Sequence, residues 1–233
     1  LRPRDLSEII GQDHLLGEQA PLRQMIDQGH LPSIIFWGPP GVGKTTIALL
    51  LAQAVDRPFI SLSALNTGVK ELREIIAESG DLLTPVVFID EIHRFNKSQQ
   101  DALLNAVEKG KITLIGATTE NPSFEVNGAL LSRCQVYTLN ILDSESIQTL
   151  LDKALQTDEF LKERHIQIEE YDALIQFAAG DARKALNLLD LIASTFEPGL
   201  ENIINNAIVV KVAQQNIARY DKSGEQHYDL VSA

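Results

Sequence analysis

Cysteine is almost absent from this sequence, because Cys134 is the single one among 233 residues. One cysteine cannot form a disulfide within the chain, so the fold must be held together without covalent cross-links. Proteins of reducing compartments commonly lack disulfides. We therefore expect a cytoplasmic protein.

Long hydrophobic runs are also absent. A membrane-spanning helix needs about 20 consecutive apolar residues, whereas the longest candidates here, such as Pro85–Ile89, have the length of a buried strand. The first residue is Leu1 rather than methionine, and no signal peptide follows it. We expect a soluble chain, trimmed at its start, with no membrane partner.

Positive charge is scarce. Lys and Arg number 20 against 32 Asp and Glu, which gives a net charge of −12 and a pI of about 4.8. A domain that binds DNA without a partner usually has a basic face. Contact with DNA would therefore need a local basic patch, a basic partner, or an assembly that concentrates a few cations. The other proportions, 44% hydrophobic and 22% charged residues, are those of a globular protein.

Short apolar runs alternate with helical patterns over the first part of the chain. This alternation is typical of a parallel sheet that is covered by helices on both faces. The expected fold class is therefore α/β, with a three-layer domain around a parallel sheet of five strands. The expected strands cover residues 33–37, 58–62, 85–90, 112–117 and 136–139, and the expected helices cover 44–55, 69–78 and 98–109.

The pattern changes near residue 141, because the later expected helices follow one another with no strand between them. We therefore predict an α/β domain over 1–141, an all-α lid domain over 142–200, and a helical linker over 201–233. Asp143 or Ser144 is expected to cap the first lid helix. The expected lid helices run to about residue 157, then over 171–179 and 182–195.

A glycine-rich loop lies between the first expected strand and the helix after it. Its sequence fits G-x-x-x-x-G-K-T, in which glycines turn backbone N–H groups toward one anion and the helix adds its positive N-terminus. Lys44 would reach the β- and γ-phosphates, and the Thr45 hydroxyl would hold Mg²⁺; the alternative is a chance glycine-rich turn. We predict that ATP and Mg²⁺ bind here, with ATP contacted by Gly38, Pro39, Pro40, Gly41, Val42, Gly43, Lys44, Thr45 and Thr46.

Two carboxylates follow the buried strand Val86–Ile89. Ligands of open α/β sheets bind beyond the carboxyl ends of the strands, where Asp90 and Glu91 lie. We expect Asp90 to bind Mg²⁺ through water and Glu91 to polarise the attacking water, which would make the nucleotide site hydrolytic. The alternative is an acidic pair that caps a helix.

Polar residues also follow the next expected strand, within Gly116–Asn121. A hydroxyl or an amide at this edge of the sheet would orient water against the γ-phosphate. Thr119 is the first choice for this role, followed by Asn121 and Thr118. The alternative is an ordinary polar turn after a strand.

Two arginines are candidates for the cations that phosphoryl transfer needs. Arg133 ends an expected helix just before a strand, and Arg183 begins a helix of the all-α part. Such a cation can come from a neighbouring subunit. From spacing alone, a surface ion pair is the favoured interpretation of each arginine.

Together these elements resemble the AAA+ ATPases, and within them the clamp-loader clade. Three stretches, Asp90–Asp101, Gly116–Phe124 and Gly224–Asp229, look like the bacterial RarA (MgsA) family and its eukaryotic relative, the Werner helicase-interacting ATPase. The resemblance covers essentially the whole chain. It is carried as well by Leu1–Arg4, Ile10–Gln12, Ser132–Cys134 and Gly180–Asn187.

The resemblance implies roles for residues outside the phosphate loop. Arg4 and Ile10 would lie by the adenine. Arg133 would be the finger that acts on the ATP of the next subunit. Arg183 would be sensor 2, which reaches the γ-phosphate from the lid.

The resemblance also implies roles for the residues after the strands. Asp90 and Glu91 would form the Walker B pair, and Thr119 or Asn121 would be sensor 1. Arg94 would restrain Glu91 until DNA is bound.

The activity that the resemblance implies is DNA-dependent ATP hydrolysis in replication fork maintenance, DNA repair and recombination. The implied partners are single-stranded, gapped or forked DNA ends, single-strand DNA-binding protein, and further copies of the chain in a tetramer, in the bacterial cytosol at the nucleoid. A clamp-loader ATPase subunit is one alternative. A nucleotide-gated DNA-binding scaffold with little turnover is the other.

Two departures from the family pattern bear on assembly. The segment Gly80–Thr84 is brief, which indicates that residues are missing there. Family chains also continue past Ala233 into a helical domain that drives tetramer formation, so residues 201–233 would include the start of a truncated oligomerisation domain. We therefore expect an ATPase core that is monomeric by itself.

Overall fold

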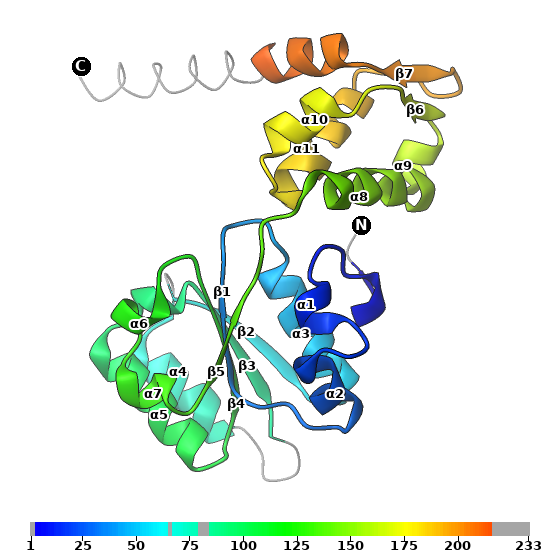
Figure 1. Cartoon of the computed structure of the whole chain (residues 1–233). Coiled ribbons are helices and arrows are strands. Elements are labelled where there is room, and N and C mark those ends of the chain that lie inside the picture. Colours follow the sequence, from blue (N-terminus) through cyan, green and yellow to red (C-terminus); the bar gives the residue numbers. More distant parts are fainter. Residues whose placement is uncertain (1–2, 65–66, 79–83, 216–233) are drawn as a thin grey trace, which may run out of the picture. The chain divides into compact units, whose positions relative to one another are not determined.

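The computed structural model describes residues 3–64, 67–78 and 84–215. Contacts within the chain divide it into two compact units, one ending at Ile141 and the other beginning at Leu142 (Figure 1). Each unit has a hydrophobic core of its own. The Gly224–Asp229 stretch and most of the brief segment at 80–84 lie outside the described residues.

The first unit is built on a five-stranded sheet. Its strands are β1 (Ile34–Trp37), β2 (Phe59–Ser63), β3 (Val86–Asp90), β4 (Thr113–Thr118) and β5 (Gln135–Thr138). Their order is β2-β3-β4-β1-β5, and every pairing is parallel, which confirms the predicted sheet. The carboxyl ends of all five strands therefore meet at one edge, where open α/β sheets bind their ligands.

Helices cover both faces of this sheet (Figure 1). They are η1 (Leu6–Glu8), α1 (Asp13–Leu16), α2 (Pro21–Asp27), α3 (Lys44–Ala54), α4 (Val69–Glu78), η2 (Ile92–Arg94), α5 (Lys97–Glu108), α6 (Pro122–Glu125) and α7 (Gly128–Leu131). Successive side chains of a strand point to opposite faces. Ile34 and Phe36 therefore join one core cluster with α2 and α3, whereas Ile35 joins another with α4, α5 and α7.

The second unit consists of helices and one small sheet. Its helices are α8 (Ser144–Thr157), α9 (Glu159–Lys162), α10 (Asp172–Ala178) and α11 (Ala182–Ala193), with a further helical segment over residues 206–215. Three helices begin at aspartates, since Asp143, Asp158 and Asp181 each accept a hydrogen bond from a backbone N–H of the first turn. In the described part of the chain, no helix has the length and hydropathy of a membrane span.

The small sheet corrects two expectations, because one of its strands lies in the predicted all-α lid and the other in the predicted helical linker over 201–233. β6 (Ile166–Ile168) and β7 (Asn202–Ile204) pair in parallel. Each strand has three residues, and a run this short has too few residues for periodicity to indicate a strand. The side chain of Asn202 holds the second strand in place, because its Nδ2 lies 2.7 Å from the Arg164 carbonyl oxygen.

Candidate nucleotide site

The loop after β1 is shaped by its glycines. The Gly38 N–H donates to the carbonyl of Thr118 at 3.1 Å, which extends the pairing of β1 with β4. A Cβ on Gly38 would lie 2.7 Å from the Leu139 carbonyl oxygen, so only glycine fits there. Gly41 and Gly43 have φ angles of 73° and 97°, in the left-handed region that favours glycine. These turns leave room for an anion beside the backbone N–H groups.

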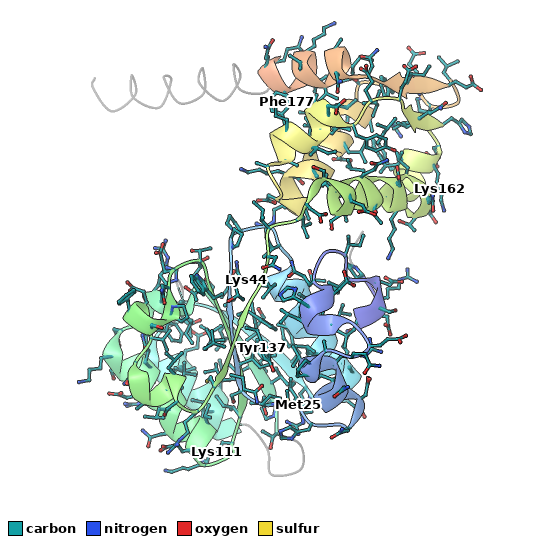
Figure 2. All side chains as sticks on the ribbon, viewed as in Figure 1. Met25, Lys44, Lys111, Tyr137, Lys162 and Phe177 are labelled. Carbon is teal, nitrogen blue, oxygen red and sulfur yellow. The ribbon has the colours of Figure 1, made fainter. Side chains whose placement is uncertain are left out.

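Lys44 is the first residue of α3 and lies at the carboxyl edge of the sheet (Figure 2). Its side chain is buried, with 8% of the residue exposed. Nζ donates hydrogen bonds to the carbonyls of Gly38 at 2.7 Å and Pro39 at 2.8 Å. The ammonium is therefore held inside the loop, where the N-terminus of α3 also favours negative charge. A nucleoside triphosphate fits this combination of a cation and a helix N-terminus.

The acidic pair lies at the same edge, at the end of β3. Asp90 is the last residue of the strand, and the carbonyl of Asp90 accepts from the Ala64 N–H at 3.2 Å. α3 contacts β3, so the helix that carries Thr45 adjoins the strand that carries Asp90. A hydroxyl and a carboxylate, with water and phosphate oxygens, make up the donor set that Mg²⁺ prefers. The residues therefore fit Mg²⁺, which would neutralise charge on the phosphates when bound.

Glu91 follows Asp90 in a strained conformation. Its φ of 55° and ψ of 46° are left-handed, which is unfavourable for a residue with a Cβ, and such strained residues often occur at active sites. This turn brings His93 back toward Glu91, and the imidazole Nε2 lies 3.3 Å from the carboxylate Oε2. Arg94, by contrast, is exposed. The side chain that reaches Glu91 is thus His93, which the sequence reading did not single out.

The three polar candidates at the end of β4 differ in their surroundings. Thr118 is fully buried, and its Oγ1 lies 2.9 Å from Nδ1 of His93. Asn121 Oδ1 accepts from the Ser123 N–H at 3.0 Å and so caps α6. Thr119 is half-buried just past the strand end, and its hydroxyl has no hydrogen bond to any residue that the structure describes. Thr119 is therefore the hydroxyl available to a ligand at this edge, although its sensor role stays a prediction.

Arg133 lies away from the phosphate loop of its own chain. It precedes β5, whose first residue Gln135 pairs with Ile34 at the start of β1, whereas the loop follows the end of β1. Nε and Nη2 of Arg133 donate to Glu108 Oε1 at 3.2 Å and 3.1 Å. Both side chains are about half exposed, at 54% and 42%. Any action of Arg133 on ATP would therefore have to be on another copy of the chain.

The remaining predicted site residues lie on other elements of the chain. Arg4 borders a hollow with Leu50 and Ala54, at the opposite end of α3 from Lys44. This geometry does not support a contact between Arg4 and adenine. Ile10 is half-buried in the same N-terminal segment. Arg183 is exposed near the start of α11, in the second unit, and its sensor role stays a prediction.

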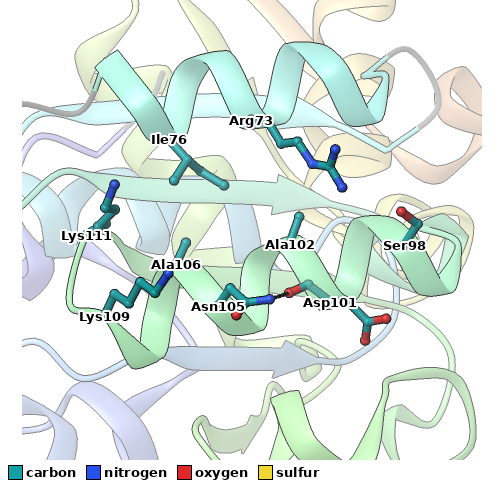
Figure 3. Close-up of a pocket in the computed structure, with 9 residues that line it drawn as sticks. All are labelled: Arg73, Ile76, Ser98, Asp101, Ala102, Asn105, Ala106, Lys109 and Lys111. Carbon is teal, nitrogen blue, oxygen red and sulfur yellow. Dashed lines mark hydrogen bonds between the residues drawn. The ribbon is translucent and has the colours of Figure 1, made fainter.

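A second hollow, of about 410 Å³, lies between α4 and α5 (Figure 3). Arg73 comes from α4, and Lys109 and Lys111 follow the end of α5. None of the three cations forms a salt bridge with a residue that the structure describes. Asp101 is the one acidic residue of the lining, and its Oδ1 accepts from Asn127 Nδ2 at 3.0 Å. This basic hollow is a local exception in an acidic chain.

A parallel sheet in this strand order, with a lysine loop after β1 and an acidic pair after β3, defines a P-loop nucleoside triphosphatase with a second, mainly helical unit. The family model described as "ATPase family associated with various cellular activities (AAA)" matches residues 34–140. The model of the "AAA C-terminal domain" matches residues 161–233. The chain belongs to the AAA ATPases, in the family of replication-associated recombination protein A (RarA) and WRNIP1.

Relatives and solved structures agree with this assignment. Replication-associated recombination protein A of Coxiella burnetii is 46% identical over 239 residues, which cover 100% of this chain and 54% of that protein. ATPase WRNIP1 of Dictyostelium discoideum is 40% identical over 256 residues, with 100% of this chain and 29% of that protein covered. The Thermotoga maritima RuvB Holliday junction branch migration motor has a TM-score of 0.77 at 26% identity, covering 91% of this chain and 72% of that one. The chain thus spans about half the length of the curated RarA relative that it matches.

Proposed function

We propose that this chain hydrolyses ATP with Mg²⁺ at the carboxyl edge of the sheet. The observation that carries the proposal is the meeting of Lys44 and the Asp90–Glu91 pair at that edge, where β1 and β3 flank β4. Lys44 would leave the loop carbonyls for the β- and γ-phosphates. Thr45 and Asp90 would hold Mg²⁺, and Glu91 would polarise the attacking water.

We propose further that DNA stimulates this hydrolysis and that the protein acts in replication-associated recombination and fork repair. The names of the relatives support this role, since they include replication-associated recombination protein A. The proposed DNA ligands are single-stranded, gapped or forked ends, and single-strand DNA-binding protein is the proposed protein partner. The proposed location is the bacterial cytosol at the nucleoid.

We propose the basic hollow between α4 and α5 as the site where DNA binds. Arg73, Lys109 and Lys111 would contact phosphates, whose neutralisation makes binding depend steeply on salt. Replacing all three with glutamine is expected to weaken DNA binding and to reduce the salt slope by roughly 1 for each lost contact. The matched control replaces three exposed lysines of the second unit, Lys162, Lys184 and Lys211. Equal salt slopes for both triple variants would place the DNA elsewhere.

Assembly is part of the proposal because Arg133 lies at the edge opposite the phosphate loop. A finger role for Arg133 requires a neighbouring copy of the chain, for which we propose a homo-oligomer, a tetramer in the longer protein. The 233-residue chain alone would then bind ATP and turn it over slowly. If a neighbouring copy is required, the ATPase rate per subunit should rise as the protein concentration is increased.

The deciding experiment measures ATP hydrolysis without DNA and with single-stranded, gapped and forked DNA. It is run on the 233-residue chain and on a longer form that continues past residue 233. We expect DNA to raise the rate, more so in the longer form. A rate that no DNA changes in either form would refute DNA dependence. ATP binding without turnover under every condition would favour a nucleotide-gated scaffold, and retention of a sliding clamp in a pull-down would favour a clamp-loader subunit.

A further inference from the structure

Glu91, the proposed base of the reaction, is held by one neighbouring side chain. His93 Nε2 lies 3.3 Å from Glu91 Oε2, and the two side chains are largely shielded, at 13% and 30% exposed. The left-handed backbone of Glu91 makes this contact between residues two apart. Among the residues that the structure describes, a side-chain partner is recorded for Oε2 alone, which leaves Oε1 open to a water molecule.

The other face of the imidazole meets a buried hydroxyl. Thr118 Oγ1 lies 2.9 Å from His93 Nδ1 and accepts from the Glu120 N–H at 3.0 Å. The carbonyl oxygen of Glu120 lies 3.2 Å from the same hydroxyl. A hydroxyl has one proton to donate, so Thr118 can donate either to His93 or to this more distant carbonyl.

The carboxylate decides between these two arrangements. With the proton on Nδ1, a neutral imidazole would direct the lone pair of Nε2 at the negative Oε2 of Glu91, which is repulsive. With the proton on Nε2, the imidazole N–H group faces the negative carboxylate at 3.3 Å, which is attractive, and Nδ1 accepts the Thr118 proton. Both contacts of the imidazole are then favourable, and the hydrogen bond at one ring nitrogen fixes the state of the other.

We propose that His93 is the positioning residue for Glu91, and that Thr118 selects the imidazole tautomer that can perform this task. This inference rests on the proposed hydrolysis of ATP. His93 acts through Glu91, because its Nε2 lies against Oε2 and thereby aims Oε1 at the water. Thr118 ends β4, one residue before Thr119, so the end of this strand is linked to the orientation of Glu91.

Two substitutions of His93 separate its ring nitrogens. In His93→Gln, the terminal amide nitrogen reaches the place of Nε2 and can still donate to Glu91. In His93→Asn, the shorter amide reaches only the place of Nδ1, toward Thr118. We expect kcat to fall on the order of 10- to 100-fold in His93→Asn and His93→Ala, as for a misaligned catalytic group. His93→Gln should recover most of the loss, and the Kd of ATP should stay within about threefold of wild type in all three, because the proposal gives His93 a role through Glu91 rather than in binding nucleotide.

The role of Thr118 is tested by substituting it in the wild-type protein and in His93→Gln. Thr118→Val removes the hydroxyl, whereas Thr118→Ser keeps it and serves as the control. Thr118→Val is expected to lower kcat in the wild type and to cost little more in His93→Gln, whose amide needs no tautomer. A purely structural role for Thr118 would lower kcat equally in both backgrounds, since independent effects add. Additive losses would therefore refute the tautomer part of the proposal.

A spectroscopic readout makes the test independent of turnover. ¹⁵N spectra of the imidazole distinguish the two neutral tautomers, and the wild type should show the proton of His93 on Nε2. Thr118→Val should shift the ring toward a mixture, and Thr118→Ser should not. A proton on Nδ1 in the wild type, or full kcat in His93→Ala, would overturn the inference. If the wild type hydrolyses no ATP at all, the proposed function fails, and the tautomer result still decides the role of Thr118.

Discussion

Lys44 Nζ donates a hydrogen bond to the carbonyl of Gly38 across 2.7 Å, so the cation of the phosphate loop is bound by the loop itself. A second hydrogen bond, to the Pro39 carbonyl, fixes it further. These two hydrogen bonds hold the ammonium within the loop. Binding exchanges two neutral acceptors for a charged one, and hydrogen bonds to charged groups are the stronger kind.

Lys44→Ala should therefore weaken binding of Mg²⁺–ATP. Loss of a hydrogen bond to a charged group costs about 1.5–3 kcal/mol, which corresponds to an affinity roughly 10- to 100-fold lower. Titration calorimetry with a non-hydrolysable ATP analogue measures the change. Lys162→Ala, at an exposed lysine of the second unit, is the control for charge alone. Equal affinities of the two variants would show that Lys44 does not contact phosphate.

Glu91→Gln should keep ATP binding and abolish turnover. The amide is similar in size to the carboxylate but is a poor proton acceptor, and general base catalysis contributes about 10²–10⁴-fold to a rate. Single-turnover hydrolysis and ATP affinity are measured side by side. Hydrolysis at the wild-type rate would remove Glu91 from the role of base, and lost affinity would indicate a binding role instead.

Arg133→Ala should leave nucleotide affinity nearly intact and lower the ATPase rate of the assembled protein. Arginine fingers contribute about 10³-fold or more, whereas the exposed pair with Glu108 contributes at most about 1 kcal/mol to stability. Glu108→Ala is the matched control, because it breaks the same ion pair and keeps the arginine. A large loss of affinity with unchanged turnover would place Arg133 at the site of its own chain.

The phosphate loop and the acidic pair could be predicted because each is a local pattern. Lys44 follows a glycine at the start of an expected helix, and Asp90 follows directly on a run of apolar residues. Once the alternation of elements indicates a parallel sheet, both must lie at its carboxyl edge. The spacing of nearby residues and one rule about parallel sheets are therefore enough to predict the phosphate loop and the acidic pair.

The neighbours of Glu91 could not be predicted in the same way. The contact with His93 depends on a backbone φ of 55° at Glu91, which the residue types do not indicate. The partner on the other side, Thr118, lies 25 residues further along the chain and meets His93 only because β4 lies beside β3. The family resemblance favours Arg94 as the partner of Glu91, but the direction of a side chain in a tight turn depends on the backbone angles of that turn.

Gly116→Ala should destabilise the first unit. A Cβ at Gly116 would lie 2.7 Å from Ile35 Cδ1 and 2.8 Å from Ile92 Cδ1, and both isoleucines are fully buried. Forcing an extra methyl group into a packed core costs about 1–3 kcal/mol. For a chain of this size, Tm should fall by roughly 2–4 °C for each kcal/mol. Gly128→Ala is the control, since nothing lies within 4 Å of its added Cβ; an equal Tm for both variants would contradict the prediction.

Cys134, beside Arg133, should be slow to react with alkylating reagents. Burial raises the pKa of its thiol from 9.0 to about 12, and the thiolate is the reactive form. A raised pKa keeps the thiol neutral, so at pH 8 the reactive fraction is roughly a thousandth of that of an ordinary cysteine. Alkylation by iodoacetamide, followed by mass spectrometry, should be slow in the native protein and should accelerate about tenfold for each pH unit up to pH 11. The same chain in guanidinium should react at the ordinary rate, and native and denatured rates within tenfold of each other at pH 8 would show that the thiol is accessible to water.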